Sequence, residues 1–172
     1  MPKLLSYYTN SITAINRLFF YLAATLMVVI VPVMLYEVFS RYLFNAPTKW
    51  GMELALLMFG PYFLFGGPYL LHLKGHVNLD VLHQRVSPNV ARVLDLFNQV
   101  IIMVFCGILF VYAWPLAIQS FEFRETSFSA WNPPVWHVKF TVPIAVALLG
   151  AQSLAEFLQL LFNKPVRQGT DS

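Results

Sequence analysis

The sequence predicts an all-α membrane protein with four transmembrane helices, and two observations lead to this fold class. The first is composition: 58% of the 172 residues are hydrophobic, the mean hydropathy is +0.64, and only 11% of the residues are charged. Soluble domains carry about 25% charged residues, so a soluble globule of this composition would expose a large apolar surface to water. The second is that uncharged stretches of about twenty residues, the length that crosses roughly 30 Å of hydrocarbon, recur four times.

The same composition excludes other broad classes of protein. The 16 Phe, 8 Tyr and 4 Trp residues supply more apolar area than a disordered chain tolerates. The 11 Lys and Arg residues are scattered singly, without a basic run that would follow a phosphate backbone, so we expect no nucleic-acid partner. The single cysteine, Cys106, lies in an apolar stretch, where we expect it to serve in packing.

The predicted spans cover residues 18–36, 54–73, 96–121 and 140–162 of a single transmembrane domain formed by residues 1–172. The first is longer than the core of a signal peptide and no A-x-A-like cleavage site follows it, so we expect a retained anchor. The third is long enough to tilt or to extend into the membrane interface. Glu156 interrupts the fourth, but the runs are otherwise continuously apolar, without the alternation of a barrel wall, which favours helices over strands.

Glycine and proline residues interrupt the second span at positions 60–61 and 66–68. Such residues kink or loosen a membrane helix, and a broken helix forms the substrate site in some secondary transporters. Those transporters show the break twice, whereas the third and fourth spans offer only Pro115 and Pro143 without matching glycines. We therefore predict a kink that shapes a packing surface.

Lys and Arg residues in the connections predict the orientation of the helices, because cytoplasmic loops carry an excess of both. Seven lie before the first span, between the second and third, or after the fourth, and four lie in the other two connections. This bias predicts that both termini and the middle connection are cytoplasmic. The seven are Lys3, Arg17, Lys74, Arg85, Arg92, Lys164 and Arg167, and the four are Arg41, Lys49, Arg124 and Lys139.

Glu37 and Arg41 are four positions apart at the outer end of the first span, so on a continuing helix they share a face and can pair. Burying either charge alone in a membrane is costly, and pairing lowers that cost. Two interpretations stay open. The pair reaches toward water at the helix end, or it contacts a partner subunit or Glu53, which lies near the start of the second span.

Three histidines near the second span, His72, His76 and His83, suggest a haem or metal site. Two histidines that hold one haem must lie on facing helices at similar depth, but the predicted topology separates these three from His137 by the thickness of the membrane. Only Asp80 accompanies the three, which disfavours a metal ion. Contact with lipid headgroups or a hydrogen bond that fixes the loop is favoured, and we expect no metal and no cofactor.

Small and polar residues form two rows on the fourth span. Ala147, Ala151 and Ala155 recur every four residues, which predicts a stripe where another helix approaches closely. Gln152 and Glu156 form the second row. A carboxyl group inside a span is a candidate proton carrier, but Glu156 lies only about six residues, roughly 9 Å, from the cytoplasmic end, where it can reach the interface or pair with a partner. Polar residues thus gather at the ends of the spans, which favours a docking bundle over a transport pathway.

Several motifs, taken in order, resemble a known family. They are Arg41-Tyr42-Leu43-Phe44-Asn45-Ala46-Pro47, then Trp50 with Glu53-Leu54, then Gly75-His76-Val77 with Asp80. In a four-span protein of this size, this order resembles the small membrane subunit of tripartite ATP-independent periplasmic (TRAP) transporters, the DctQ family, over roughly residues 17–162. The stretch from Trp131 to Trp136, together with Lys139, Pro143 and residues 152–156, looks like the branch labelled for mannitol or chloroaromatic compounds. One departure is Gly51-Met52-Glu53, which stands where many members have two acids after the tryptophan.

The resemblance implies a small scaffold subunit in the bacterial inner membrane. In such a transporter a large membrane subunit carries the substrate and sodium sites and moves like an elevator, and a periplasmic binding protein captures the solute, often an organic acid. The small subunit packs against the large one in the lipid bilayer. The residues that we expect at contacts with partners are Glu37, Arg41, Lys49, Trp50, Glu53, Arg124, Ala147, Ala151, Ala155, Gln152 and Glu156.

Two alternatives from other functional classes remain. A stand-alone carrier that works as a four-helix homodimer needs an acid in its first span exposed to a central cavity, and Glu37 is near the outer end for that role. A redox subunit that holds haem would show a Soret band. An enzyme is not expected, because no phosphate-binding loop, nucleophile with an adjacent base or pair of catalytic carboxylates occurs in the sequence.

Overall fold

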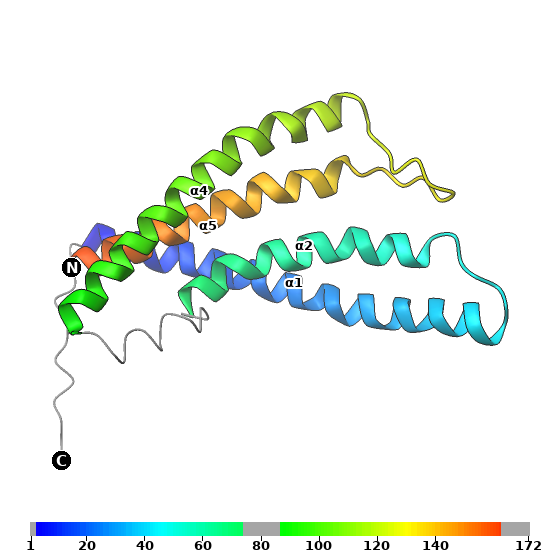
Figure 1. Cartoon of the computed structure of the whole chain (residues 1–172), viewed down its shortest axis with the longest axis horizontal. Coiled ribbons are helices and arrows are strands. Elements are labelled where there is room, and N and C mark those ends of the chain that lie inside the picture. Colours follow the sequence, from blue (N-terminus) through cyan, green and yellow to red (C-terminus); the bar gives the residue numbers. More distant parts are fainter. Residues whose placement is uncertain (1–2, 74–86, 163–172) are drawn as a thin grey trace, which may run out of the picture.

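The computed structural model of the chain describes residues 3–73 and 87–162. This part of the chain forms four helices (Figure 1): α1 (Lys3–Leu43), α2 (Gly51–His72), α4 (Pro88–Glu122) and α5 (Trp136–Phe162). Each is long and apolar enough to cross a membrane. The predicted all-α fold with four spans is therefore confirmed.

The helices extend beyond the predicted spans, most of all at the start of α1 and α4. The prediction followed uncharged stretches, which mark the hydrocarbon layer, but a helix continues into polar sequence when nothing stops its backbone hydrogen bonds. In α1 the added turns place Thr9 and Asn16 against the bundle, where both are buried. In α4 the extended residue Ser87 is followed by Pro88, whose fixed φ suits the first turn of a helix.

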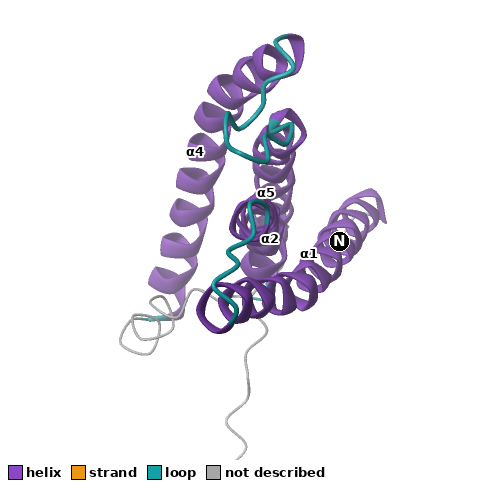
Figure 2. Ribbon diagram, turned by 90° about the vertical axis from the view of Figure 1, so that its right-hand side faces the viewer, coloured by secondary structure: helices purple, strands orange, loops and turns teal. Residues whose placement is uncertain are grey.

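The four helices form a row in which α5 holds the central contacts. Among the described elements, α4 packs only on α5, whereas α5 also packs on α2 and touches α1, and α1 packs mainly on α2. Figure 2, which looks along the long axis of the molecule, shows α4 and α1 at opposite edges with α5 and α2 between them. A row of this kind leaves broad faces of α1 and α4 without contacts inside the chain.

From Thr9 onward, the buried side chains of α1 recur every seven residues. A strict seven-residue repeat keeps one stripe of a helix facing its neighbours when the helices cross at the shallow left-handed angle of coiled coils. Most members of the repeat are small or polar, as expected where membrane helices approach closely and apolar burial gives no advantage over lipid. The repeat consists of Thr9, Asn16, Ala23, Ile30 and Glu37.

Helix α2 is continuous from Gly51 to His72, although Pro61 and Pro68 lie inside it. The broken-helix arrangement considered from the sequence is therefore not formed. Pro68 is buried, while a methyl group added at Gly66 or Gly67 would meet no atom within 4 Å. The glycines thus leave one side of α2 open. Cys106 on α4 is buried, which agrees with the expected packing role.

Candidate functional site: polar anchors and partner-facing surfaces

Glu37 is the centre of a hydrogen-bonded cluster at the end of α1. Its carboxylate accepts hydrogen bonds from Arg41, at 3.1 Å from Nε and 2.5 Å from Nη2, so the pair predicted from their spacing is present. It also accepts from the backbone N–H of Thr48 at 3.1 Å and from the Thr48 hydroxyl. The side chain of Glu37 is only 2% exposed, whereas that of Arg41 is 42% exposed. The cluster therefore shields the carboxylate and turns the guanidinium outward.

Gly51 completes this Glu37 cluster, which consists of Glu37, Arg41, Thr48 and Gly51. The Thr48 hydroxyl accepts a hydrogen bond of 3.0 Å from the Gly51 N–H at the start of α2. A methyl group at Gly51 would lie 2.7 Å from the Thr48 hydroxyl oxygen and 3.0 Å from Oε2 of Glu37, closer than packed atoms come. The cluster thus joins the end of α1 to the start of α2, and it has space only for glycine at this position.

Glu53 does not join the Glu37 cluster, in contrast to one interpretation of the sequence. Its Oε2 instead accepts a hydrogen bond of 2.5 Å from the hydroxyl of Ser129, in the connection between α4 and α5. Because Glu53 and Ser129 are 76 positions apart in the chain, no local spacing rule indicates this contact. The bond links the α1–α2 half of the bundle to the α4–α5 half at this end.

At the opposite end of the bundle, Gln152 on α5 lies in a network of polar side chains. Its Oε1 accepts a hydrogen bond of 2.8 Å from Nδ2 of Asn16 on α1, and both side chains are fully buried. Its Nε2 donates to Oε1 of Glu156 at 3.1 Å and to the Thr13 hydroxyl at 3.4 Å. We name this set of side chains the α5 polar network. It consists of Thr13, Asn16, Gln152, Glu156 and His72.

Glu156 is not a lone carboxyl group. Its Oε1 lies 2.6 Å from Nδ1 of His72, the last residue of α2, in addition to the contact with Gln152. The network therefore connects three helices, α1, α2 and α5, and gives His72 a structural partner. Sequence analysis identified Glu156 and Gln152 as partner candidates but missed their internal contacts, because Glu156 and His72 are 84 positions apart.

Helix α4 is fastened to α5 by two further contacts. The Ser153 hydroxyl donates to the side chain of Gln99, with an oxygen-to-oxygen distance of 2.7 Å, and both residues are buried. The guanidinium of Arg92 donates to the backbone carbonyl of Leu160 at 2.5 and 3.0 Å and to that of Leu161 at 3.1 Å. A helix leaves its last carbonyls without intrahelical partners, so Arg92 caps the end of α5.

The predicted alanine stripe on α5 is divided between the inside and the outside of the bundle. Ala155 is 0% exposed and Gln152 is equally buried, so neither is available to a second protein. The carbonyl of Ala151 accepts a hydrogen bond of 3.2 Å from the Tyr8 hydroxyl, and Ala147 is exposed. The expectation of a partner-facing stripe is thus corrected for Ala155 and Gln152: α1 and α2, not a partner, cover this part of α5.

Residues 123–135 form a hairpin between α4 and α5. A bridge pairs Thr126 with Pro134, and the N–H of Val135 donates to the carbonyl of Glu125 at 2.9 Å. At the tip, Phe128 is 87% exposed and adopts a left-handed backbone, with its N–H donating to Asn132 Oδ1 at 3.0 Å. Hydrogen bonds within the turn therefore fix an exposed aromatic ring.

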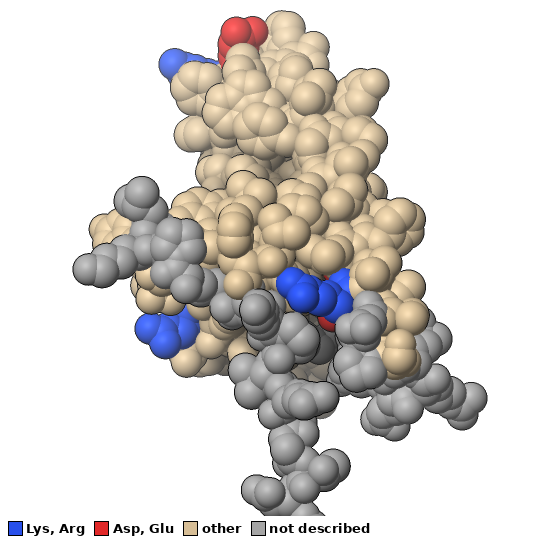
Figure 3. Space-filling model, turned by 90° about the vertical axis from the view of Figure 1, so that its left-hand side faces the viewer, with Lys and Arg blue, Asp and Glu red and all other residues tan. Residues whose placement is uncertain are grey.

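The remaining outer-side candidates are exposed. Lys49 and Arg124 both face away from the bundle, and Trp50 stacks on Tyr36 with ring centroids 6.1 Å apart. Lys139 forms an ion pair of 2.5 Å with Glu125 of the hairpin. Figure 3 views the molecule from the end that carries the N-terminus, where the described surface is mostly uncharged, with a few scattered basic and acidic groups.

The histidines do not form a haem or metal site within the described residues. His72 contacts Glu156 near the end of α5, whereas His137 lies in the first turn of α5, about 28 Å away along a helix that rises about 1.5 Å per residue. His76, His83 and Asp80 lie outside the described residues. Among residues 3–73 and 87–162, no group of three His, Cys, Asp or Glu side chains is placed to hold a metal ion.

Comparison with known proteins gives two matches. The family model described as "Tripartite ATP-independent periplasmic transporters, DctQ component" matches residues 26–163. A curated relative, the sialic acid TRAP transporter permease protein SiaT of Haemophilus influenzae (strain 86-028NP), is 29% identical over 98 residues. The aligned stretch covers 57% of this chain but only 16% of the relative, so the chain matches a small part of a much longer permease.

The space at Gly51 generates a first prediction. Gly51→Ala forces a methyl group against Thr48 and Glu37, so we expect the bundle to lose about 1–3 kcal/mol of stability, as for other overpacked sites. Gly67→Ala is the matched control, because a methyl group there meets no atom within 4 Å. Thermal unfolding of both variants in detergent measures the difference. Equal midpoints for the two would contradict the described fit around Glu37.

The α5 polar network generates a second prediction. Glu156→Ala leaves His72 and Gln152 without their shared acceptor, and interhelical hydrogen bonds in membranes contribute roughly 1 kcal/mol each. We therefore expect a lower midpoint of thermal unfolding and looser packing of α2 on α5. Glu122→Ala, which removes an exposed carboxylate at the end of α4, should leave the midpoint unchanged. A larger loss for the Glu122 variant would argue against a structural role for the network.

The hairpin generates a prediction on pH. The hydrogen bond from Lys139 lowers the pKa of Glu125 below its ordinary value of 4.5. A lowered pKa in the folded state contributes stability that is present above the unfolded-chain pKa and is lost as the pH falls through the folded-state value. We expect tryptophan fluorescence near the hairpin to change below pH 4.5, and Lys139→Met to move that change to higher pH. Lys49→Met should not move it, since Lys49 is exposed and distant in sequence from the pair.

Proposed function

The chain belongs to the DctQ family of tripartite ATP-independent periplasmic (TRAP) transporter components, and from that premise we propose that it is the small scaffold subunit of such a transporter. It is a multi-pass protein of the bacterial inner membrane. The proposed partners are a large membrane subunit, which performs sodium-coupled uptake of an organic-acid-type solute, and a periplasmic binding protein that delivers this solute. The chain itself carries no solute in this proposal.

The observation that supports a scaffold most strongly is the position of the charged residues. No Asp, Glu, Lys or Arg occurs in residues 18–36, 54–71, 96–121 or 140–155, which form the middle of the four helices. An anionic solute or a cation that crosses a membrane needs polar groups or freed backbone carbonyls near the midplane. The polar side chains of this bundle gather instead in the Glu37 cluster and the α5 polar network, where they bind the helices to one another.

The position of Glu37 also disfavours the stand-alone carrier. A carrier of that kind needs an acid that faces a central cavity and exchanges its ligand. The Glu37 carboxylate is buried at the helix end and is occupied by Arg41 and Thr48. Exchange of a solute or proton there would first require the junction between α1 and α2 to open.

The proposed orientation puts both termini in the cytoplasm. The Glu37 cluster, Lys49, Trp50, Arg124 and the hairpin then lie on the periplasmic side, where exposed basic and aromatic groups are available to a binding protein. The α5 polar network lies on the cytoplasmic side. With the helices fastened at both ends, the row of four can stay fixed and widen the immobile part of the complex while the transport domain of the large subunit slides past it.

Reconstitution with and without the chain tests this proposal. Liposomes that contain the large subunit and this chain, supplied with the binding protein and a sodium gradient, should take up solute. In liposomes that lack this chain, the rate of solute uptake should be at least about tenfold lower, because the fixed part of the complex is incomplete. Full uptake by the large subunit alone would contradict the scaffold role, and solute transport by this chain alone would establish the carrier instead.

A further inference from the structure

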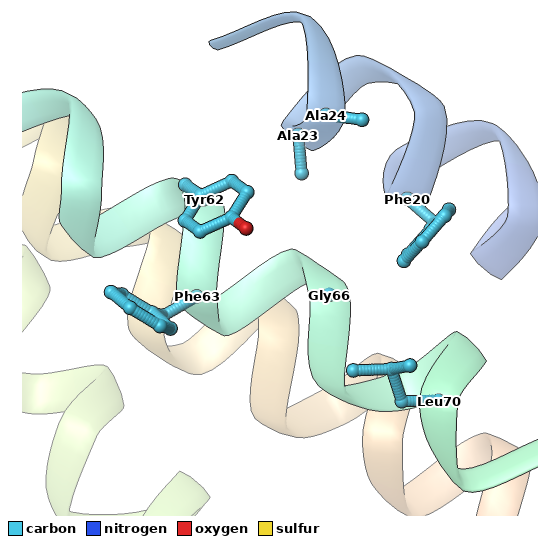
Figure 4. Close-up of a pocket in the computed structure, with 7 residues that line it drawn as sticks. All are labelled: Phe20, Ala23, Ala24, Tyr62, Phe63, Gly66 and Leu70. Atoms are coloured by element: carbon cyan, nitrogen blue, oxygen red, sulfur yellow. The ribbon is translucent and has the colours of Figure 1, made fainter. Parts of the chain in front are cut away.

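An apolar groove runs between α1 and α2 on the side that neither α4 nor α5 covers. Its enclosed part has a volume of about 200 Å³ and is lined by Phe20, Ala23, Ala24, Tyr62, Phe63, Gly66 and Leu70. Figure 4 shows these side chains around a space between the two helices, with α5 behind α2. A shallower continuation along α1 reaches Val31 and Pro32. From Phe20 to Pro32 the groove follows about 18 Å of helix.

The residues of this α1–α2 groove have the shape that a further helix requires. Small residues, Ala23, Ala24 and Gly66, lie where an incoming backbone would come closest, and Phe63 and Phe20 form raised edges. Close approach at small residues is the way in which membrane helices associate, since lipid is as apolar as any side chain. A methyl group added at Gly66 would meet no atom within 4 Å, so the chain's own packing does not require glycine there.

The Tyr62 hydroxyl group favours a protein over a lipid as the occupant of this groove. It points into the space between α1 and α2, and among the described residues it makes no hydrogen bond. Tyr62 is the twelfth of the 22 residues of α2, so its hydroxyl lies near the middle of the bilayer, where no water can satisfy it. An acyl chain offers no acceptor to this donor, whereas a helix offers a Ser, Thr or Asn oxygen or a freed carbonyl.

We infer that the α1–α2 groove receives one transmembrane helix of the large membrane subunit, and that this helix presents a hydrogen-bond acceptor to Tyr62. The inference rests on the proposed function, since it names the contact face of the scaffold. The matched stretch makes up 16% of the sialic acid permease. In that relative, the segment equivalent to these helices is therefore part of the same chain as a far larger permease. A large membrane protein beside α1 and α2 is thus the occupant that agrees with the relative.

Three leucine variants test the inference with matched chemistry. Gly66→Leu fills the groove, Gly67→Leu alters the neighbouring position of α2, and Gly107→Leu alters an open position on α4. Each is co-expressed with the large subunit, and the large subunit recovered with the tagged chain is measured in mild detergent. We expect at least a tenfold loss for Gly66→Leu and less than a twofold change for Gly107→Leu, with an intermediate or small effect for Gly67→Leu.

The outcomes separate the inference from the proposed function. If the unaltered chain recovers no large subunit, the proposed function fails. If it does recover the large subunit but Gly66→Leu does so equally well, the groove holds lipid or a second copy of this chain and the inference is overturned. A loss with Gly107→Leu alone would assign the interface to α4. If Gly67→Leu is as damaging as Gly66→Leu, the effect is general to α2 and counts against the groove.

A cysteine test covers the case in which a leucine variant fails to fold. In a Cys106→Ala background, Phe63→Cys on the rim and Phe105→Cys on α4 provide two exposed positions. A lipid-soluble maleimide should label both in the isolated chain, but in the complex the rate at position 63 should fall at least tenfold while position 105 is unchanged. Tyr62→Phe, which keeps the ring, should weaken recovery of the large subunit about threefold or more. Full labelling at position 63 in the complex would overturn the inference.

Discussion

Most of this structure depends on one constraint: a polar side chain in a bilayer must find its partner inside the protein, because the hydrocarbon supplies none. Glu37 meets this constraint with Arg41 and Thr48, and Gln152 meets it with Asn16 and Glu156. In both places one of the partners, Thr48 or Asn16, lies outside the helix that carries the group, so satisfying the group also ties that helix to a neighbouring element. The polar groups thus define which helices meet, a choice that apolar surfaces in lipid leave open.

The two sets of contacts lie at opposite ends of the helices, and they connect different numbers of helices. At one end, α5 is bound to α1, α2 and α4 through Asn16, His72 and Gln99. At the other end, each pair of helices is closed by its own connection, and the bond from Ser129 to Glu53 links the two pairs. Between these ends, Ala23 and Ile30 continue the seven-residue spacing of the buried side chains of α1. This combination gives a row of helices with a small interior among the described residues.

The sequence was sufficient to predict the features that depend on composition or on local spacing. Four spans follow from uncharged stretches, and the contact of Glu37 with Arg41 follows from a separation of four residues on one helix. The contact of Glu156 with His72 was missed because it depends on which ends of α2 and α5 meet, and no single-sequence rule gives that. The alanine stripe was assigned to a partner for a related reason: spacing shows that a helix can approach Ala155, but not whether that helix belongs to the same chain.

The same reasoning identifies the surface that remains incomplete. On α5, Ala155 is buried, and the polar groups of Gln152 and Ser153 are satisfied by residues of α1 and α4. On the other side of α2, Gly66 and Tyr62 combine a close-approach position with an unsatisfied donor, and both are only half-buried by the described part of the chain. An isolated chain would keep that hydroxyl in hydrocarbon at a cost of a few kcal/mol, which a helix from another protein can remove. The constraint that organises the bundle therefore also indicates where the bundle is unfinished.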